Sequence, residues 1–417
     1  MTTHRRALGA FTVSLGMLTL AACGGGSGFN SSSGGDDSKG SGPLNVLIGS
    51  SGDAETAAVK KAVGDWSSSS GTKATVSVAS DLNQQLSQGF ASGNPPDVFY
   101  VSTDTLAGYV NNKSLYAYGD KLGNKGAFYP NLRQAFTVDN TFYCAPKDFS
   151  TLALVINTKM WKAAGLTDAD VPTTWDQLDA VAKKLTKGKR AGLAFSPEYA
   201  RVGAFFPQAG GAMTNADRTK ATVDSPANAQ ALGFVKKMLT DGAAKYSSAL
   251  GAGWGGEAFG KGLAAMTIEG NWIAGAMQSD YPDVDYTVAQ LPAGPTGKGT
   301  LAFTNCWGIA EKSKNKPAAI KLVEKLTSTD DQLGFAKAFG VIPSVQSAAE
   351  QWKSDNPKFA PFIDGASYAQ NVPSTLGSAD VVTDFNSQLE TLAKSDPKTI
   401  LTSVQKELQS AIDASAS

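Results

Sequence analysis

The sequence predicts an α/β protein with two lobes, between which the chain passes more than once. Apolar runs alternate with amphipathic stretches from residue 43 onward, and this alternation restarts near residue 152. Alternating strands and helices are typical of mostly parallel sheets with helices on both faces. About 375 residues follow a low-complexity start, which is enough chain for two lobes with large buried cores.

Residues 1–22 are predicted to be a signal peptide. A basic start, "HRR", precedes an uncharged stretch that is shorter than the roughly 20 apolar residues of a membrane-spanning helix. The sequence "LAAC" at its end resembles the lipobox of bacterial lipoproteins. This resemblance implies that Cys23 is lipidated and becomes the first residue after cleavage. An ordinary signal peptide with an incidental cysteine is the alternative.

Residues 23–42 are predicted to be the lipidated cysteine and a flexible tether. Gly, Ser, Asn and Asp make up almost all of residues 24–42, and such a coil reaches about 25 Å on average. We therefore expect a lipid-anchored, extracytoplasmic protein on the outer face of the bacterial cytoplasmic membrane.

The first elements of the folded body are three strands that alternate with three helices. Apolar or alternating runs predict strands at 43–51, 73–80 and 96–102. Asp53 is expected to cap the first helix. One face of that helix is apolar and carries Val59, Ala62, Val63 and Trp66. A second helix is predicted at 81–93, and Asp104 opens a third at 103–112.

The alternation continues through the second half of the chain. Thr174 and Gln177 form a predicted capping box for a helix at 173–188, and Ser225 with Pro226 starts another helix. Strands are expected at 152–157, 190–196, 285–292 and 304–310. Paired helices then run through Gly340, and "VIPS" breaks them. The last 45 or so residues are helical and are expected to pack on a lobe.

The composition excludes several classes of function. His4 is the only histidine, so removal of the signal leaves none for catalytic triads, histidine-bound zinc or imidazole proton transfer. No phosphate-binding loop or dinucleotide-binding glycine pattern follows a strand. The two cysteines beyond Cys23 are too few for a structural zinc site or an iron–sulfur cluster. We therefore expect no metal and no cofactor.

The balance of charge excludes a nucleic-acid partner. Lysine and arginine together number 37, as do aspartate and glutamate, and loss of Arg5 and Arg6 with the signal leaves 35 against 37, a net charge of −2. A chain without a basic cluster lacks the phosphate neutralisation that dominates nucleic-acid binding.

Four stretches of the body carry motifs of a known family. They are "GNPPDVFYVSTDTLAGYVNNKSLYAY", "YCAPKDFSTLALVINTKMWKAAGL" with "PTTWDQL", "FGKGLAAMTIEGNW" and "WGIAEKSKNKPAAIKLVEKLTS". Taken in this order, they resemble the extracellular solute-binding proteins of carbohydrate ABC importers, in the maltose-binding-protein-like group. They span Gly93 to about Ser344, which is most of the folded body.

This resemblance implies a two-lobed periplasmic-binding-protein-like fold of type II. Residues 43–146 plus 305–342 would form lobe 1, and residues 147–304 plus 343–417 would form lobe 2. Three crossover hinge strands, near residues 144–150, 304–307 and 341–344, would join the lobes. A sugar or oligosaccharide would bind in the cleft, and the lobes would close over it if the closed state binds it more tightly. The partners implied are that carbohydrate and the membrane permease subunits of an ABC importer. We expect the protein to be a monomer, and we expect it to bind its ligand without being an enzyme.

Candidate ligand-binding residues lie in the motifs and at strand ends. The resemblance places Trp272 in the cleft, where its face would stack on a sugar; a core tryptophan is the alternative. Asp104 stands where the family has a hydroxyl-binding aspartate, with a helix cap as the alternative. Ser51 and Asp53 follow the first strand and are candidates for the same topological reason.

Two further groups of candidates come from the first crossover and from a later loop. Asp148, Ser150 and Thr151 lie on the crossover, where side chains face the cleft; a solvated turn is the alternative. Glu198 and Tyr199 lie in the loop after "GLAFS", at a position that often lines the cleft in the family.

The remaining tryptophans are interpreted by their context. Trp254 lies in the glycine-rich "GAGWGG", where no periodicity predicts burial, so we expect an exposed stacking platform; packing of the loop itself is the alternative. Trp66, Trp161 and Trp175 fit helix faces and are expected in the core.

Cys144 and Cys306 are expected to form a disulfide. They are the only thiols left once Cys23 is lipidated, and export places them in an oxidising compartment. Their surroundings, "YCAPKD" and "TNCWGIA", resemble two crossover strands that run side by side at the hinge. A pair of buried free thiols is the alternative.

Two other functions stay open at this point. A secreted glycoside hydrolase would need only two carboxylates, although the order of elements fits no eightfold barrel and no motif-embedded pair of acids stands out. The same binding fold could instead take a peptide, a polyamine or another small polar solute. A polyamine site would require several clustered acids.

Overall fold

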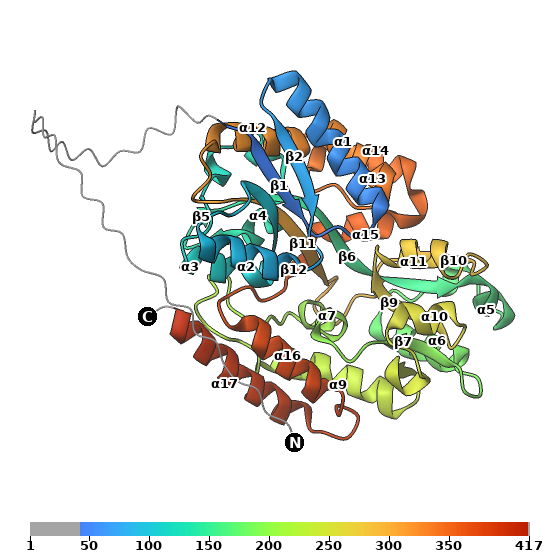
Figure 1. The fold of residues 1–417 in the computed structure, drawn as a ribbon. Helices are drawn as coiled ribbons and strands as arrows, with labels where there is room; N and C mark the ends of the chain where they lie inside the picture. The colour runs from blue at the N-terminus through green and yellow to red at the C-terminus, as the bar shows by residue number, and fades with distance from the viewer. Residues whose placement is uncertain (1–41, 416–417) are drawn as a thin grey trace, which may run out of the picture. The chain divides into compact units, whose positions relative to one another are not determined.

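The computed structural model describes residues 42–415 (Figure 1). The predicted signal peptide, Cys23 and the tether up to residue 41 lie outside the described residues. Within residues 42–415, no helix is both long and apolar enough to cross a membrane. The strands are β1 (Leu44–Ile48), β2 (Ala74–Val78), β3 (Val98–Ser102), β4 (Thr137–Val138), β5 (Thr141–Phe142), β6 (Ala145–Asn157), β7 (Ala191–Phe195), β8 (Ala244–Tyr246), β9 (Ala264–Gly270), β10 (Tyr286–Ala289), β11 (Thr300–Ile309) and β12 (Ala369–Asn371).

Helices connect and cover these strands. The α-helices are α1 (Asp53–Ser70), α2 (Leu82–Ser92), α3 (Thr103–Asn111), α4 (Pro130–Ala135), α5 (Thr158–Ala163), α6 (Trp175–Leu185), α7 (Tyr199–Val202), α8 (Phe205–Gln208), α9 (Pro226–Thr240), α10 (Gly255–Gly260), α11 (Ile273–Ser279), α12 (Lys316–Leu326), α13 (Thr329–Phe339), α14 (Ala349–Asp355), α15 (Ala360–Asp364), α16 (Ser378–Leu389) and α17 (Pro397–Ser415). The predicted strands and helices occur in the predicted order, whereas the strands β4, β5, β8, β9 and β12 were not predicted.

The sheet contains two groups of parallel strands. Its order is β2-β1-β3-β11-β6-β9-β7-β8, while β10 pairs with β6 and β12 pairs with β11. β1 lies parallel to β2 and β3, and β7 lies parallel to β8 and β9. Between these groups, β11 and β6 are antiparallel to each other and to their outer neighbours. The predicted α/β class, with crossover strands between parallel groups, is confirmed.

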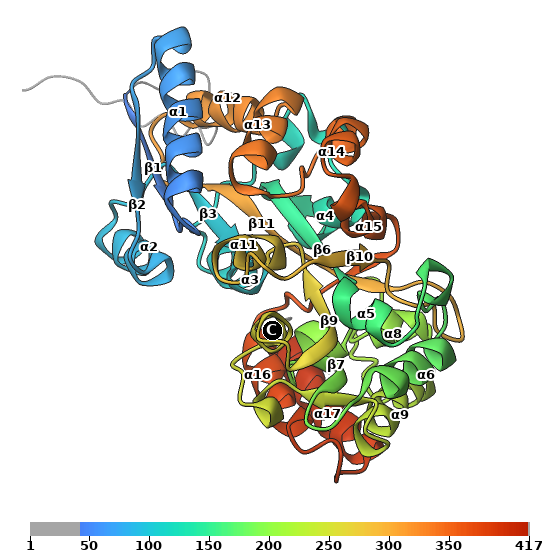
Figure 2. The same cartoon turned by 90° about the vertical axis from the view of Figure 1, so that its right-hand side faces the viewer.

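β6 connects the two groups of parallel strands (Figure 2). Residues 145–151 pair with β11, whereas residues 152–156 pair with β9. All 13 residues of β6 are buried. Periodicity alone predicts a strand only for residues 152–157, because Lys147, Asp148 and Ser150 interrupt the apolar pattern of the first half. The crossover strand that the family resemblance implies near residues 144–150 is confirmed. The structure buries these polar side chains together beside the site described below.

The start of α1 is displaced by one residue from its prediction, whereas Thr174 is the N-cap of α6 as predicted. Gly52 is the N-cap of α1, and Asp53 is its first helical residue. The Gln177 N–H donates to Thr174 Oγ1 at 3.3 Å as predicted, but the Gln177 side chain accepts from Thr173 and not from Thr174. The capping box is thus only half formed, because Thr173 offers both its N–H and its hydroxyl to the glutamine oxygen.

Buried apolar side chains form two large cores. One surrounds β1 and β3 and includes the predicted apolar face of α1, with Trp66. The other surrounds β7 and β9 and includes Trp161 and Trp175. Helices α16 and α17 pack in this second core, as predicted for the C-terminal residues (Figure 2). The expectation that Trp66, Trp161 and Trp175 are core residues is confirmed.

A third, smaller cluster lies where β6 and β10 meet α14 and α15. Trp352 of α14 and Phe362 of α15 pack there with Phe149 of β6 and Ile273 of α11. The chain after residue 348 therefore divides between this cluster and the second core. This division brings α14 next to the crossing strands, where it contributes to the site.

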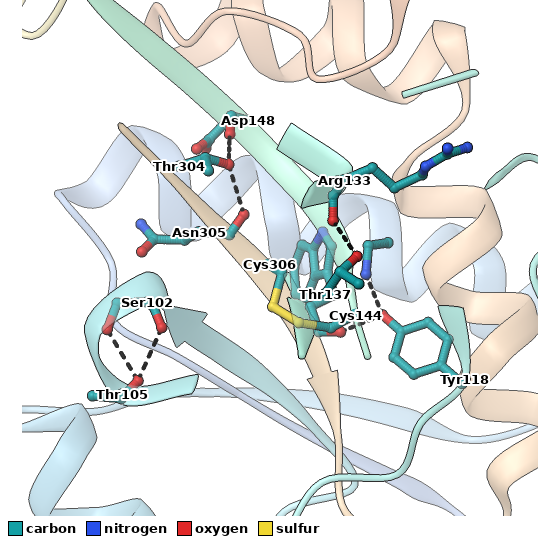
Figure 3. Close-up of a disulfide and its surroundings, with 12 residues drawn as sticks. Ser102, Thr105, Tyr118, Arg133, Thr137, Cys144, Asp148, Thr304, Asn305 and Cys306 are labelled. Carbon is teal, nitrogen blue, oxygen red and sulfur yellow. Dashed lines mark hydrogen bonds between the residues drawn. A yellow bond between two sulfur atoms is a disulfide. The ribbon is translucent and has the colours of Figure 1, made fainter. Parts of the chain in front are cut away.

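A disulfide joins Cys144, just before β6, to Cys306 of β11 (Figure 3). Both residues are fully buried. Beside them, the hydroxyl of buried Tyr118 donates to the Trp307 carbonyl and accepts from the Ala145 N–H. The predicted pairing is confirmed, and it links the two crossing strands directly.

Candidate functional site

A cavity of about 1440 Å³ opens beside the crossing strands. Its walls come from the β1–α1 connection, from β6 and β11, from residues 271–278 at the start of α11, and from residues 333–359. The carboxyl ends of β1 and β3 and the middle of β6 meet here, which is where ligands bind in α/β folds. We take this cavity as the candidate site.

Five of the predicted residues line the cavity. They are Ser51, Asp53, Asp148, Ser150 and Trp272. They are contributed by three segments that are distant in sequence and that β6 brings together. Their contacts with a ligand stay predictions.

Asp104 and Thr151 do not line the cavity. Ser102 occupies the N-cap position of α3, so Asp104 lies exposed in the first turn, and the neighbouring Thr103 lines the cavity instead. Thr151 is fully buried and donates its hydroxyl to the Phe362 carbonyl. Alternation along β6 accounts for this, because Thr151 and Ser150 point to opposite faces of the sheet.

The structure corrects the expectation for Tyr199 and favours the alternative for Trp254. Neither of them lines the cavity, and Glu198 does not line it either. Tyr199 is a core residue, 2% exposed, whose ring packs on Phe206 and Phe385. Glu198 lies 3.5 Å from an Arg201 nitrogen. Trp254 is half-buried against the third cluster, with its ring over Gly256, so the loop packs on itself.

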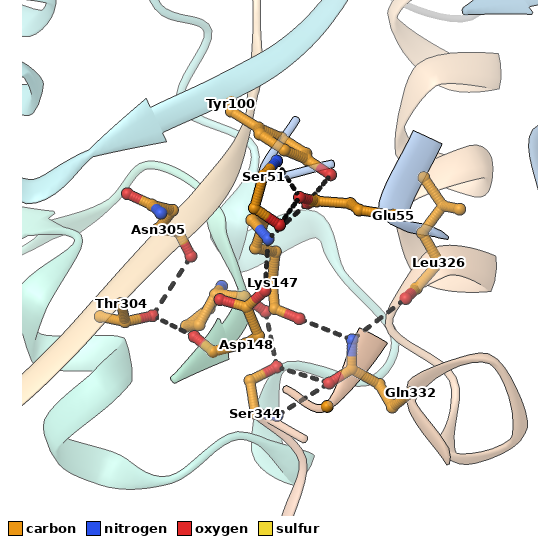
Figure 4. Close-up of polar contacts among 12 residues, drawn as sticks. Ser51, Glu55, Tyr100, Lys147, Asp148, Thr304, Asn305, Leu326, Gln332 and Ser344 are labelled. Carbon is orange, nitrogen blue, oxygen red and sulfur yellow. Dashed lines mark hydrogen bonds and ion pairs between the residues drawn. The ribbon is translucent and has the colours of Figure 1, made fainter. Parts of the chain in front are cut away.

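A buried polar cluster forms the floor of the cavity (Figure 4). Lys147 contacts two carboxylates, with its Nζ 3.2 Å from Glu55 Oε1 and hydrogen-bonded to Asp148 Oδ2. The Tyr100 hydroxyl donates to Glu55 Oε1 at 2.9 Å. The N–H and the hydroxyl of Ser51 both donate to Glu55 Oε2 at 2.7 Å. Glu55 therefore holds the β1–α1 connection against β3 and β6.

These contacts set the charges of the floor. Burial tends to raise the pKa of Glu55, but the charge of Lys147 and the hydrogen bonds from Ser51 and Tyr100 outweigh it and lower that pKa. Burial tends to lower the pKa of Lys147, but Asp148 and Glu55 outweigh it and raise that pKa. Burial raises the pKa of Asp148 against the opposing charge of Lys147. Lys147 is thus a permanent cation that stabilises an ionised Glu55.

Glu55, Tyr100 and Lys147 were not among the site residues predicted from the sequence. Glu55 lies four and seven residues before Val59 and Ala62, on the stripe that the helix buries. An acidic residue on such a stripe requires a buried partner, which is a signal that was available in the sequence. Nothing in the sequence identified the partner as Lys147.

The backbone of the floor is fixed by polar residues from α13 and β11. The Gln332 amide donates to the Lys147 carbonyl at 2.7 Å and accepts from the Ser344 N–H at 2.8 Å. The Thr304 hydroxyl donates to the Asp148 carbonyl at 2.6 Å. All three predicted crossover segments therefore meet at Lys147 and Asp148.

Trp272 forms an exposed apolar wall of the same cavity. It is 38% exposed, and its ring lies edge-on to Phe303 at a centroid distance of 5.4 Å. The preceding Asn271 donates its N–H to Ser150 Oγ at 2.9 Å, which ties this wall to β6. The cavity thus combines a flat aromatic surface with polar groups, a combination that suits a ligand with both apolar faces and hydroxyls.

The charges that line the cavity favour a neutral or cationic ligand. Four carboxylates and two lysines line it: Asp53, Glu55, Asp148, Asp355, Lys147 and Lys337. No group of three or more potential metal ligands of the His, Cys, Asp or Glu type occurs among residues 42–415. The site can therefore bind by stacking and hydrogen bonding.

Comparison with known proteins agrees with this arrangement. Residues 49–333 match the profile of the bacterial extracellular solute-binding protein family. A binding protein of Brucella abortus (strain 2308) is 24% identical over 334 residues, which are 77% of this chain and 80% of that protein. The diacetylchitobiose-binding protein of Streptomyces coelicolor is 25% identical over 365 residues, 84% of each chain.

Solved structures show the same fold. The crystal structure of a cyclic α-maltosyl-1,6-maltose-binding protein from Arthrobacter globiformis superposes with a TM-score of 0.79 at 21% sequence identity. The superposition covers 89% of this chain and 100% of that one.

Proposed function

This chain belongs to the family of bacterial extracellular solute-binding proteins, and we propose that it binds a saccharide for an ABC importer. The observation that carries this proposal is the exposed indole of Trp272 in one cavity with carboxylate, amide and hydroxyl groups. A sugar ring offers apolar C–H faces to an indole and hydroxyls to polar groups. The names of the diacetylchitobiose-binding relative and of the cyclic maltosyl-maltose-binding neighbour support the same ligand class.

Capture is proposed to work by hinge closure of two lobes. Residues 43–146 plus 305–342 would move as lobe 1, and residues 147–304 plus 343–417 as lobe 2. The crossing of β6 and β11 between the two groups of parallel strands supports this division. A ligand that contacts both Trp272 and the floor would bind the closed state more tightly, which supplies the free energy of closure.

The protein is proposed to bind its ligand without converting it. The family consists of binding proteins. In the floor, Glu55 and Asp148 both contact Lys147, so they are held as an ion cluster. A glycosidase needs one carboxylic acid that donates a proton and a second carboxylate that is free to act as base or nucleophile.

We further propose that the protein is anchored to the membrane by lipid, and that it delivers its ligand to the permease subunits as a monomer. Support for the anchor comes from the "LAAC" sequence at Cys23 and from the glycine- and serine-rich residues that follow it. The tether would hold the binding domain close to the outer face of the membrane.

A thermal-shift screen tests the ligand class. Maltose, maltotetraose and diacetylchitobiose should include at least one ligand that raises the melting temperature, because a ligand that binds only the native state adds RT ln(1 + [L]/Kd) to stability. Chromatography after long incubation should recover the saccharide unchanged. A shift with spermidine or a peptide alone would favour another solute, and accumulation of cleaved sugar would favour a hydrolase.

A further inference from the structure

Glu269, at the end of β9, is a fully buried carboxylate that accepts three hydrogen bonds through one oxygen. Trp272 Nε1–H donates to Glu269 Oε2 at 3.0 Å. Arg201 Nε–H and Nη2–H donate to the same oxygen at 3.1 and 2.7 Å. Glu269 itself is 0% exposed and does not line the cavity. It therefore acts on the cavity wall only through Trp272 and Arg201.

Arg201 supports one face of the same indole. Its guanidinium carbon lies 5.2 Å from the centroid of the Trp272 ring, within the range of a cation–π contact. Its Nη1 lies 3.5 Å from a Glu198 carboxylate oxygen. The arginine side chain is 11% exposed, so Glu269 provides most of the compensation for its buried charge.

Close packing leaves little freedom around the indole and the carboxylate. The six-membered part of the Trp272 ring lies over the Cα of Gly270, and Phe303 meets the ring edge-on. A Cβ at Gly255 would lie 2.7 Å from Glu269 Oε1 and 2.6 Å from Thr267 Oγ1. Only glycine lets the start of α10 approach the carboxylate this closely.

We propose that Glu269 is a positioning residue that holds the Trp272 indole in its stacking orientation and thereby sets saccharide affinity. This inference rests on the proposed function. An indole with a fixed N–H edge and one supported face loses little freedom when a flat ligand stacks on its open face. Without the carboxylate, Trp272 would have to be ordered by the ligand itself, and part of the binding free energy would be lost.

A ligand-free measurement tests the orientation. The near-ultraviolet circular dichroism of the wild-type protein minus that of Trp272→Phe gives the signal of the fixed indole. The same difference, recorded between Glu269→Gln and Glu269→Gln/Trp272→Phe, should be less than half of the wild-type value. The neutral amide oxygen is a weaker acceptor than a carboxylate, and the N–H groups of Arg201 and Trp272 compete for it. An unchanged difference signal would overturn the proposal, whatever the natural ligand.

Saccharide titration tests the consequence. With the panel sugar that gives the largest thermal shift, Glu269→Gln should raise Kd at least fivefold. Once Trp272→Phe has removed the N–H donor, the same change at Glu269 should raise Kd less than twofold. An equal loss in both backgrounds would mean that Glu269 does not act through Trp272, and the proposal would fail.

A matched control and a second variant complete the test. Thr267→Val removes a buried hydroxyl that has no hydrogen-bond partner among the described residues, and it should leave Kd within twofold. If Glu269→Gln does not fold, Arg201→Lys takes its place, because lysine cannot donate in the fork geometry of arginine. Arg201→Lys with unchanged Kd and circular dichroism would then overturn the proposal. If wild-type protein binds no sugar, the proposed function fails while the circular-dichroism test still decides the role of Glu269.

Discussion

Cys144 and Cys306 lie 162 positions apart in the sequence, yet their Cα atoms are 5.7 Å apart and a disulfide joins them. The bond ties the residue before β6 to the middle of β11, the two strands that cross between the parallel groups. It lies to one side of Asp148 and Thr304 and does not line the cavity (Figure 3). A covalent link at this place restrains the crossing strands without blocking the cavity.

Removal of the disulfide should reduce stability and spare binding. Closure of a loop of this length stabilises the folded state by up to about 5 kcal/mol in the chain-entropy model, so Cys144→Ala/Cys306→Ala should melt at a clearly lower temperature. Its saccharide Kd should stay within a few-fold of wild type. Alkylation of denatured, unreduced protein that begins after Cys23 should add no mass, and the addition of two alkyl groups would contradict the bond.

Trp272→Ala should weaken saccharide binding by roughly 1 to 3 kcal/mol with little change in melting temperature. The ring is 38% exposed, so its removal costs less buried apolar area than the loss of a core tryptophan would. Calorimetric titration and thermal melting measure the two effects. Trp254→Phe is the matched control, because Trp254 lies outside the cavity, and it should leave Kd unchanged. A large fall in melting temperature for Trp272→Ala would assign Trp272 to the core.

Glu55 should contribute to loss of stability in acid. Its pKa in the folded protein lies below the ordinary value of 4.5, so the ionised carboxylate stabilises the fold at neutral pH, and this contribution is lost as the pH falls through the folded pKa. Glu55→Gln should therefore lose less unfolding free energy between pH 6 and pH 3 than wild type does. Urea denaturation across this range measures the difference. If the unfolding free energies of wild type and Glu55→Gln change equally with pH, the contacts of Glu55 with Lys147 and Tyr100 do not matter for stability.

The site should discriminate against anionic sugars. Four carboxylates and two lysines line the cavity, so a uronic acid should bind at least tenfold more weakly than the matching neutral saccharide. Added salt should reduce this difference in affinity, because it screens the repulsion between the carboxylates and the anionic sugar. Asp148→Asn should also narrow it, since it removes one of the negative charges. Equal affinities for the two sugars would show that the lining charges do not select the ligand.

Cys23→Ser should release the protein from the membrane. The lipid reaction requires the cysteine sulfur, so full-length wild type expressed in a bacterium with labelled palmitate should carry label and sediment with membranes. The serine variant should lose both properties. A wild-type protein that is exported without label would support an ordinary signal peptide.

Predictions from the sequence were most accurate where a local pattern sufficed. The apolar stripe of α1 through Trp66 and the cap of α9 by Ser225 follow from the geometry of one helix. The pairing of Cys144 with Cys306 followed from the count of thiols and from the resemblance of their strands to the hinge. The start of β6 was indicated only by the family resemblance, because its polar residues are buried by partners that no local pattern reveals.

The sequence by itself determined the order of strands and helices, the family and the presence of Trp272 in a cleft motif, because these depend on periodicity and on short motifs. Only the tertiary structure decided which polar residues meet. Glu55 and Lys147 are 92 positions apart, and their ion pair exists because the fold brings the first turn of α1 next to β6. Tyr199, predicted to line the cleft, is buried instead, since Phe385 of α16 covers its ring. Burial depends on which distant segment packs on a residue, and that is a property of the folded chain.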